Sequence, residues 1–187
     1  RVVALIAFGS LVVVAVGAFR KDAQPASTDR HTGHGGYALV GESPLALLYD
    51  PDTPAGRGAL DLAGDAGALK GVSFARFRLR PGVVATCLNL YRPQRPRVLG
   101  APESFVREAR FAFADSLATT QTERANPWLL LERNDPDGAL PTIVDANSLT
   151  YVLHHQLGDV MEVDRGGSPP LRLRFVAALR DSLFQGE

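Results

Sequence analysis

The sequence is poor in cysteine and has no excess of charge of either sign. Its single cysteine, Cys87, cannot form an internal disulfide, which excludes a disulfide-stapled scaffold. Lysine plus arginine and aspartate plus glutamate number 20 each among 187 residues. Without a net basic field there is no electrostatic attraction for nucleic acid, so we expect no nucleic-acid partner.

Motifs for catalysis and cofactor binding are also missing. The stretch "GHGGYALVG" is no phosphate loop, because no strand precedes it and no helix follows directly. There is no G-x-S-x-G nucleophile elbow, and Cys87 has no histidine near it in sequence. The turn "NDPDG" at residues 134–138 lacks the acidic spacing of a calcium loop. The sequence therefore predicts no catalytic residue, no cofactor, no metal site and no enzyme activity.

What the sequence does contain is a long apolar run at residues 2–19, "VVALIAFGSLVVVAVGAF". As a helix this uncharged run would span roughly 27 Å, close to the ~30 Å of a bilayer's hydrocarbon core. The alternatives are a buried strand pair, for which Gly9-Ser10 is the only turn, and a signal-peptide core, which normally precedes a small-residue cleavage site. We expect residues 1–20 to form a transmembrane helix, in a fragment of a longer membrane protein.

After this run the chain is polar and then alternates between strand and helix patterns. Residues 21–36 predict a juxtamembrane linker in which His31 and His34 are solvated, because the neighbouring glycines argue against a helix. Residues 37–187 predict an α+β domain with mixed or antiparallel strands packed against helices. We expect strands within residues 37–42, 75–80, 86–91 and 141–145, and helical segments within residues 103–117 and 123–133.

The strand predicted at residues 75–80 has one apolar face and one basic face. The basic face carries Arg76, Arg78 and Arg80, and the sequence shows no acidic partner for this stripe. These three arginines are our candidate contacts for lipid phosphates or a partner protein. Phe74 falls out of phase with the apolar face, which predicts a bulge near it.

The paired histidines in "SLTYVLHHQLGD", residues 148–159, raise the question of a metal site. The apolar spacing predicts a core-packing helix, capped by Asp145 or Asn147 and ended by Gly158. At about 100° per residue, His154 and His155 flank the apolar stripe and diverge, so they cannot readily bind one ion.

A β-hairpin is predicted after this helix, from residues 160–164 and 171–175. Both strands alternate, and antiparallel pairing would set Glu162 and Asp164 opposite Arg172 and Arg174. We expect cross-strand ion pairs on a solvated sheet face rather than a lipid or nucleic-acid site.

Several stretches resemble the extracytoplasmic core domain of MacB-like and FtsX-like ABC transporter permeases. They are "PTIVDANSLTYVLHHQLGDVMEV", "LRLRFVAALRDSLFQGE", "GGYALVGES" and "CLNLYRPQRPRVLG", and the apolar run ending "VAVGAFRKD" is similar to the membrane helix that feeds the domain. Ala177-Ala178 departs from the Val-Gly pair of that pattern, and the linker with His31 and His34 has no firm counterpart.

The resemblance implies an α+β domain, often in two lobes, with residues of about 71–139 inserted into the first lobe. It implies a bacterial cytoplasmic-membrane location, with the domain facing the periplasm or cell exterior. ATP would be hydrolysed by a separate cytoplasmic nucleotide-binding subunit and coupled to export, lipoprotein handling or activation of a periplasmic partner. The linker at residues 21–36 predicts the softer connection to the membrane, and the strand at residues 171–179 the stiffer one.

Two other classes of function are also compatible with the sequence. One is a single-helix membrane-anchored sensor or lipid- or solute-binding module, and the other is a hydrolase whose catalytic residues the motifs do not reveal. A second membrane span soon after Glu187 in the parent gene would favour the permease.

Overall fold

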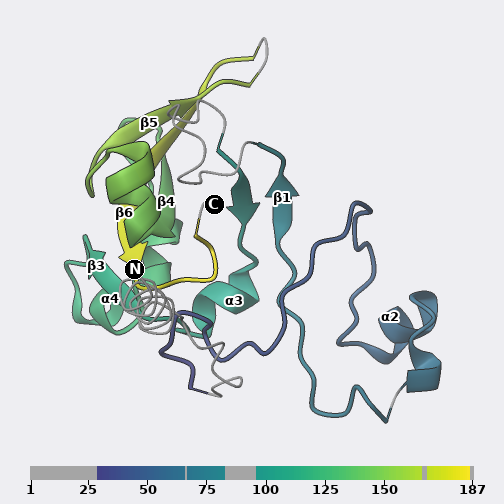
Figure 1. Cartoon of the computed structure of the whole chain (residues 1–187). Coiled ribbons are helices and arrows are strands. Elements are labelled where there is room, and N and C mark those ends of the chain that lie inside the picture. Colours follow the sequence, from purple (N-terminus) through teal and green to yellow (C-terminus); the bar gives the residue numbers. More distant parts are fainter. Residues whose placement is uncertain (1–28, 66, 83–95, 166–167, 186–187) are drawn as a thin grey trace, which may run out of the picture.

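A computed structural model describes residues 29–65, 67–82, 96–165 and 168–185 (Figure 1). The described part is mixed α+β, as the sequence predicts. Its strands are β1 (Arg78–Arg80), β2 (Val98–Gly100), β3 (Phe113–Ser116), β4 (Leu140–Asp145), β5 (Val160–Val163) and β6 (Leu171–Leu179). Its helices are all short: α2 (Pro54–Ala59), η1 (Ala63–Asp65), α3 (Glu103–Arg107), α4 (Gln121–Ala125), η2 (Pro127–Glu132) and η3 (Ser148–Leu153).

The main sheet is built around β6, its longest strand. β4 runs parallel to β6 along one edge. β5 and β3 are both antiparallel to β6 and share the other edge, where β5 pairs with Leu171–Arg174 and β3 with Ala177–Leu179. β6 is therefore the one strand bonded on both sides, and its residues Phe175–Leu179 are all buried. This near-continuous apolar stretch is typical of a strand covered on both faces.

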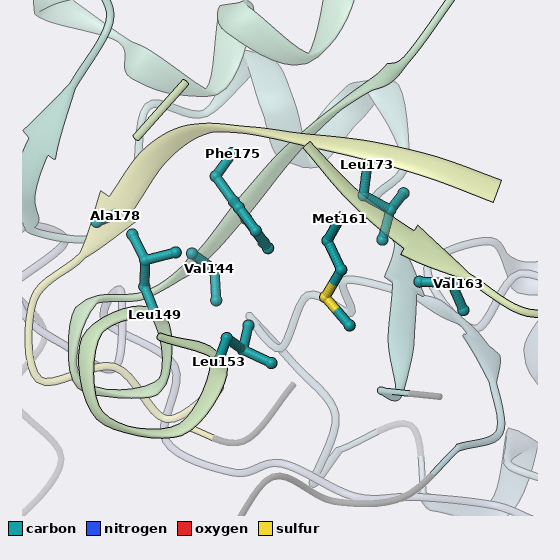
Figure 2. Close-up of a cluster of buried hydrophobic side chains, with 8 residues drawn as sticks. All are labelled: Val144, Leu149, Leu153, Met161, Val163, Leu173, Phe175 and Ala178. Atoms are coloured by element: carbon teal, nitrogen blue, oxygen red, sulfur yellow. The ribbon is translucent and has the colours of Figure 1, made fainter. Parts of the chain in front are cut away.

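One face of the sheet packs against η3 (Figure 2). Leu149 and Leu153 project from this π-helix towards Phe175 and Val144 on the strands. The complete buried set is Val144, Leu149, Leu153, Met161, Val163, Leu173, Phe175 and Ala178. The alternation predicted for the hairpin is confirmed, because Met161 pairs with Leu173 and both face this core.

An aromatic cluster forms a second core. Its buried members are Phe105, Val106, Phe111, Trp128 and Leu179, and Tyr37, Phe77, Phe113 and Phe184 pack against them. Leu179, on β6, connects this cluster to the sheet, and α3 and η2 supply Phe105 and Trp128.

The start of α4 is stabilised by local contacts. Thr120 and Glu123 form a capping box there, which satisfies amide donors that a helix N-terminus leaves unpaired.

The helix predicted after β4 is shorter than expected. It ends at His154, whose backbone is left-handed (φ 55°), rather than at Gly158. The reason is that the chain must already join β6 there: the Gly158 amide donates to the Phe175 carbonyl (2.8 Å) and the Phe175 amide to the Asp159 carbonyl (3.1 Å). Asp145 does cap the helix, as predicted, whereas Asn147 makes no side-chain cap bond.

Other predicted elements are also corrected. Residues 37–42 form no strand, and none of the described strands pairs with them. The strand expected over residues 75–80 begins only at Arg78, where pairing with β2 starts. The bulge expected near Phe74 is absent from this pairing, and the Phe74 amide instead donates to the Asp52 carboxylate at 3.1 Å. Within residues 103–117 the helix stops at Arg107 and β3 follows.

Two predicted elements fall outside the described residues: the transmembrane helix at residues 1–20, and the strand at residues 86–91, which contains Cys87. Residues 21–28 of the predicted linker also lie outside them. In the part of the chain that is described, no helix combines the length and apolar character that a membrane crossing requires.

Candidate functional site: the terminal junction

The first and last described segments meet on one turn of the domain. We call this meeting point the terminal junction; it comprises residues 29–37, 109–112 and 180–185. The Phe111 amide donates to the Arg30 carbonyl (2.7 Å), and the Ala112 amide donates to the Thr32 carbonyl (3.2 Å). From the other side, the Arg180 amide donates to the Ala112 carbonyl (2.8 Å). The turn at residues 109–112 is therefore hydrogen-bonded to both terminal segments.

The two terminal segments also contact each other directly. The Leu183 amide donates to the Gly33 carbonyl at 3.0 Å. A Cβ at Gly33 would lie 1.9 Å from the Asp181 carbonyl oxygen, a distance that no side chain tolerates. Residues 29–36 therefore differ from the solvated linker that their composition predicts, because glycine here permits close backbone packing.

Aromatic rings fill the space behind the junction. Phe111 lies 5.2 Å from Phe184, 6.3 Å from Tyr37 and 5.9 Å from Trp128, measured between ring centroids. Gly35, with φ 60°, leaves room for the Phe111 ring, which a Cβ would approach to 2.4 Å. Rings from both ends of the described chain thus share one cluster, which adds apolar and aromatic contact to the backbone bonds.

A guanidinium group ties this cluster to the first segment. Arg110 lies over the Tyr37 ring, with 4.6 Å between its Cζ and the ring centroid, and its Nη1 donates to the Gly35 carbonyl at 2.9 Å. Burial, with a further contribution from the Glu108 carboxylate, raises the pKa of Tyr37. Tyr37 therefore stays neutral and acts here as a ring surface for the cation.

A buried carboxylate connects the junction to the end of β4. Asp145 is fully buried, and one of its oxygens accepts from the backbone amides of Asn147 (3.0 Å) and Ser148 (3.1 Å). The other oxygen accepts from the Ser182 amide at 3.2 Å. Asp145 therefore caps η3 and at the same time accepts a hydrogen bond from the last segment.

The predicted arginine stripe is divided among different partners. Arg76 pairs with Asp50 at 3.0 Å, and Arg80 donates from Nη2 to the Asp164 carbonyl at 3.0 Å. The Nη1 atom of Arg80 is buried and has no hydrogen-bond partner among the described residues. Arg78 is exposed. Arg76 and Arg78 are therefore both exposed, but Arg76 is paired with Asp50, and Arg80 is partly buried by its contact with residue 164.

The second arginine pair also has a partner that sequence reasoning missed. Glu162 does lie opposite Arg172 in the strand register, as predicted. Arg174, however, forms ion pairs with Asp135 and Asp137 of the 134–138 turn, and Arg172 donates to the Asp137 carbonyl. The Arg174 guanidinium lowers the pKa of Asp135. The turn is therefore an anchor for β6.

The histidines occupy separate environments. His154 is exposed at the end of η3, while the His155 Nδ1 lies 3.2 Å from an Asp159 carboxylate oxygen. The bond from the Gln156 amide and that from His155 lower the pKa of Asp159. His31 and His34, in the first terminal segment, are exposed, as predicted. Among the described residues no group of histidine, cysteine, aspartate or glutamate side chains is arranged to hold a metal ion.

Sequence reasoning did not find the junction, although one signal was present. Gly33, Gly35 and Gly36 stand in a polar stretch, where glycine usually indicates a loose loop, and only the structure shows what packs against them. Ala109 (φ 52°) and Phe111 (φ 76°) have left-handed backbone that no local pattern predicts.

Comparison of the chain with protein-family profiles, with curated proteins and with solved structures gives no significant match.

Proposed function

We propose that this chain is the extracytoplasmic domain of an ABC transporter permease of the MacB-like or FtsX-like kind. In this proposal a separate cytoplasmic subunit hydrolyses ATP, and the domain couples that hydrolysis to export, lipoprotein handling or activation of a periplasmic partner. It takes no catalytic role and binds no cofactor. It sits on the outer side of a bacterial cytoplasmic membrane.

The terminal junction is the observation that carries the proposal. A domain that responds to the movement of membrane helices needs its two connections to be close together and firmly attached to its core. Here the first and last described segments share a hydrogen bond, Leu183 to Gly33, and both are bonded to Ala112. The apolar run at residues 2–19 lies upstream of this junction in the sequence, which supports a membrane connection on that side.

The junction bears on which of the two connections to the membrane is the stiffer. Composition predicts the softer connection at residues 21–36, yet Arg30, Thr32 and Gly33 each accept a backbone hydrogen bond from the domain. The last segment is held by Asp145 and by the bond from Arg180. We therefore infer that both connections transmit movement, rather than the last one alone.

The test is a set of flexible Gly-Ser insertions in the full transporter. An insertion after Glu187 or between Thr32 and Gly33 should behave as a slack coil. Each should reduce transport or partner activation severalfold while ATP hydrolysis continues, because the pull no longer reaches the domain. The matched control is the same insertion after Gly71, an exposed turn glycine with open space around it.

The measurements are ATPase rate and export or activation, made side by side. Normal transport with both junction insertions would contradict mechanical coupling. A parent gene with no second membrane span after Glu187, together with activity that requires no ATPase, would favour the membrane-anchored sensor instead.

A further inference from the structure

A cavity of about 270 Å³ lies beside the terminal junction, and no part of the proposed coupling uses it. Three segments line it: the first terminal segment at His31, the turn at residues 109–113, and the end of α4 together with Pro127. Phe113 and Pro127, both half-buried, supply apolar surface, whereas the Phe111 ring is buried in the aromatic cluster. The cavity is open to solvent, and its volume lies just below the range usual for small-ligand pockets, about 300–1,000 Å³.

The polar side chains of the lining are all basic. They are His31 and Arg124, and the lining residues include no carboxylate. The neighbouring Glu123 does not neutralise Arg124, because its carboxylate is bonded to Arg133 at 2.7 Å. Arg124 itself has no ion pair within the part of the chain that the structure describes. Asp29, the acidic residue nearest to His31 in sequence, accepts a hydrogen bond from the His31 backbone amide at 2.9 Å.

The backbone at this cavity is strained, in the same turn that makes the hydrogen bonds of the terminal junction. Both Ala109 and Phe111 line the cavity and both have left-handed backbone. For a residue as bulky as phenylalanine this conformation is a true outlier. Such strain is common where a chain is shaped around a ligand.

We propose that this cavity binds a small organic anion, a carboxylate or phosphate group carried on a short apolar body. The guanidinium of Arg124 forms the charged contact, because its planar fork matches the oxygens of either group. His31 donates a second hydrogen bond from its ring, and the apolar body lies against Phe113 and Pro127. A bound ligand would join the first turn to α4 and so stabilise the junction. The site does not depend on the permease assignment.

The chain contains its own reporter for this site. Trp128 is the only tryptophan, follows Pro127 directly, and has its ring 5.7 Å from that of Phe113. Titration of the full chain with hexanoate, followed by Trp128 fluorescence, should give a saturable change. Hexyl phosphate should give the same change, whereas hexanol, which lacks the charge, should bind at least tenfold more weakly.

Variants separate a built site from weak apolar adsorption. Arg124→Gln should weaken hexanoate binding at least tenfold, Arg124→Lys should restore part of the affinity, and His31→Asn should cost less, about threefold. Arg78→Gln is the matched control, since Arg78 is also exposed but lies outside the cavity. Equal binding of hexanol and hexanoate, unchanged affinity in Arg124→Gln with a normal unfolding midpoint, or no saturable signal in the intact chain would each overturn the proposal.

Discussion

The two halves of the described chain use apolar residues in opposite ways. In the sheet half, residues 98–185, leucine, valine and phenylalanine recur with a regular period and are buried in contiguous clusters. In residues 38–74, which we call the arm, most of the large apolar residues are exposed and they follow no regular period. Leu39, Leu45 and Leu48 are 90%, 79% and 80% exposed. In Figure 1 the arm extends away from the sheet and carries α2.

The difference shows that apolar content alone does not make a core. In the sheet half, β3, β4 and β5 all pair with β6, so their side chains are held in fixed positions against it. The arm is held mainly by single polar contacts: Asp50 with Arg76, Glu42 with Arg97, and Asp52 with the Phe74 amide. Such exposed contacts contribute little to stability. We therefore expect the free energy of unfolding to come from the sheet half.

Matched leucine truncations give the largest test of this contrast. Leu130 is 0% exposed beneath β6, and Leu130→Ala should cost about 2–5 kcal/mol of unfolding free energy, because it removes buried surface and leaves a cavity. Leu48→Ala in the arm removes the same atoms but should change stability by less than about 0.5 kcal/mol. Denaturant unfolding of both variants measures the difference. Equal costs would show that the arm is packed in solution.

Matched aspartate substitutions give the next largest effect. Asp145→Ala leaves the amides of Asn147, Ser148 and Ser182 without their buried acceptor, and should cost about 2–4 kcal/mol. Asp52→Ala in the arm loses one exposed contact, to the Phe74 amide, and should cost less than about 1 kcal/mol. Amide hydrogen exchange at Ser182 should accelerate only in the Asp145 variant. Unchanged protection there would exclude Asp145 as the link to the last segment.

Sequence reasoning was accurate where a local pattern and the tertiary structure agree. The β4 strand, the hairpin with Met161 opposite Leu173, and the cap by Asp145 all follow from alternation or from turn chemistry. These features depend on contacts between near neighbours in the chain, so a short window of sequence contains the information.

It failed where distant segments decide the conformation. The helix after β4 stops at His154 because Gly158 and Asp159 pair with Phe175, and nothing within the helix itself specifies this. The glycines of the junction read as a loose linker, although Gly33 is needed for close approach to Asp181. The candidate site was missed for the same reason, because three segments far apart in sequence create it.

Acid titration of the α4 cap gives a smaller and pH-dependent effect. The Arg133 guanidinium, helped by the backbone amide of Thr120, holds the pKa of Glu123 far below its ordinary value of 4.5. Stability from this charge is complete above pH 4.5 and is lost as the pH falls through the lowered pKa of the folded state. The thermal midpoint of the wild type should therefore fall more steeply below about pH 4.5 than that of Glu123→Gln, which cannot titrate.

A double-mutant cycle isolates this pair. Glu123→Gln and Arg133→Gln should be non-additive near neutral pH, since each removes the same ion pair. The coupling should shrink as the pH falls from about 4.5 towards the lowered pKa of Glu123, because protonation removes the charge. Coupling that is constant across the pH range would assign it to the neutral hydrogen bonds instead.

Serine substitutions in the arm should have the smallest effect on folding and the clearest effect on association. The triple variant Leu39→Ser, Leu45→Ser and Leu48→Ser removes three of the most exposed large apolar side chains. Since these side chains bury little surface in the folded chain, the unfolding free energy should stay within about 0.5 kcal/mol of the wild type. Exposed apolar side chains can promote association when they gather on one surface, so sedimentation velocity should show less self-association in the variant. Leu140→Ser, at a 52% exposed position on β4, is the matched control and should leave association unchanged. A large loss of stability in the triple variant would place the arm within the core and remove the contrast between the two halves.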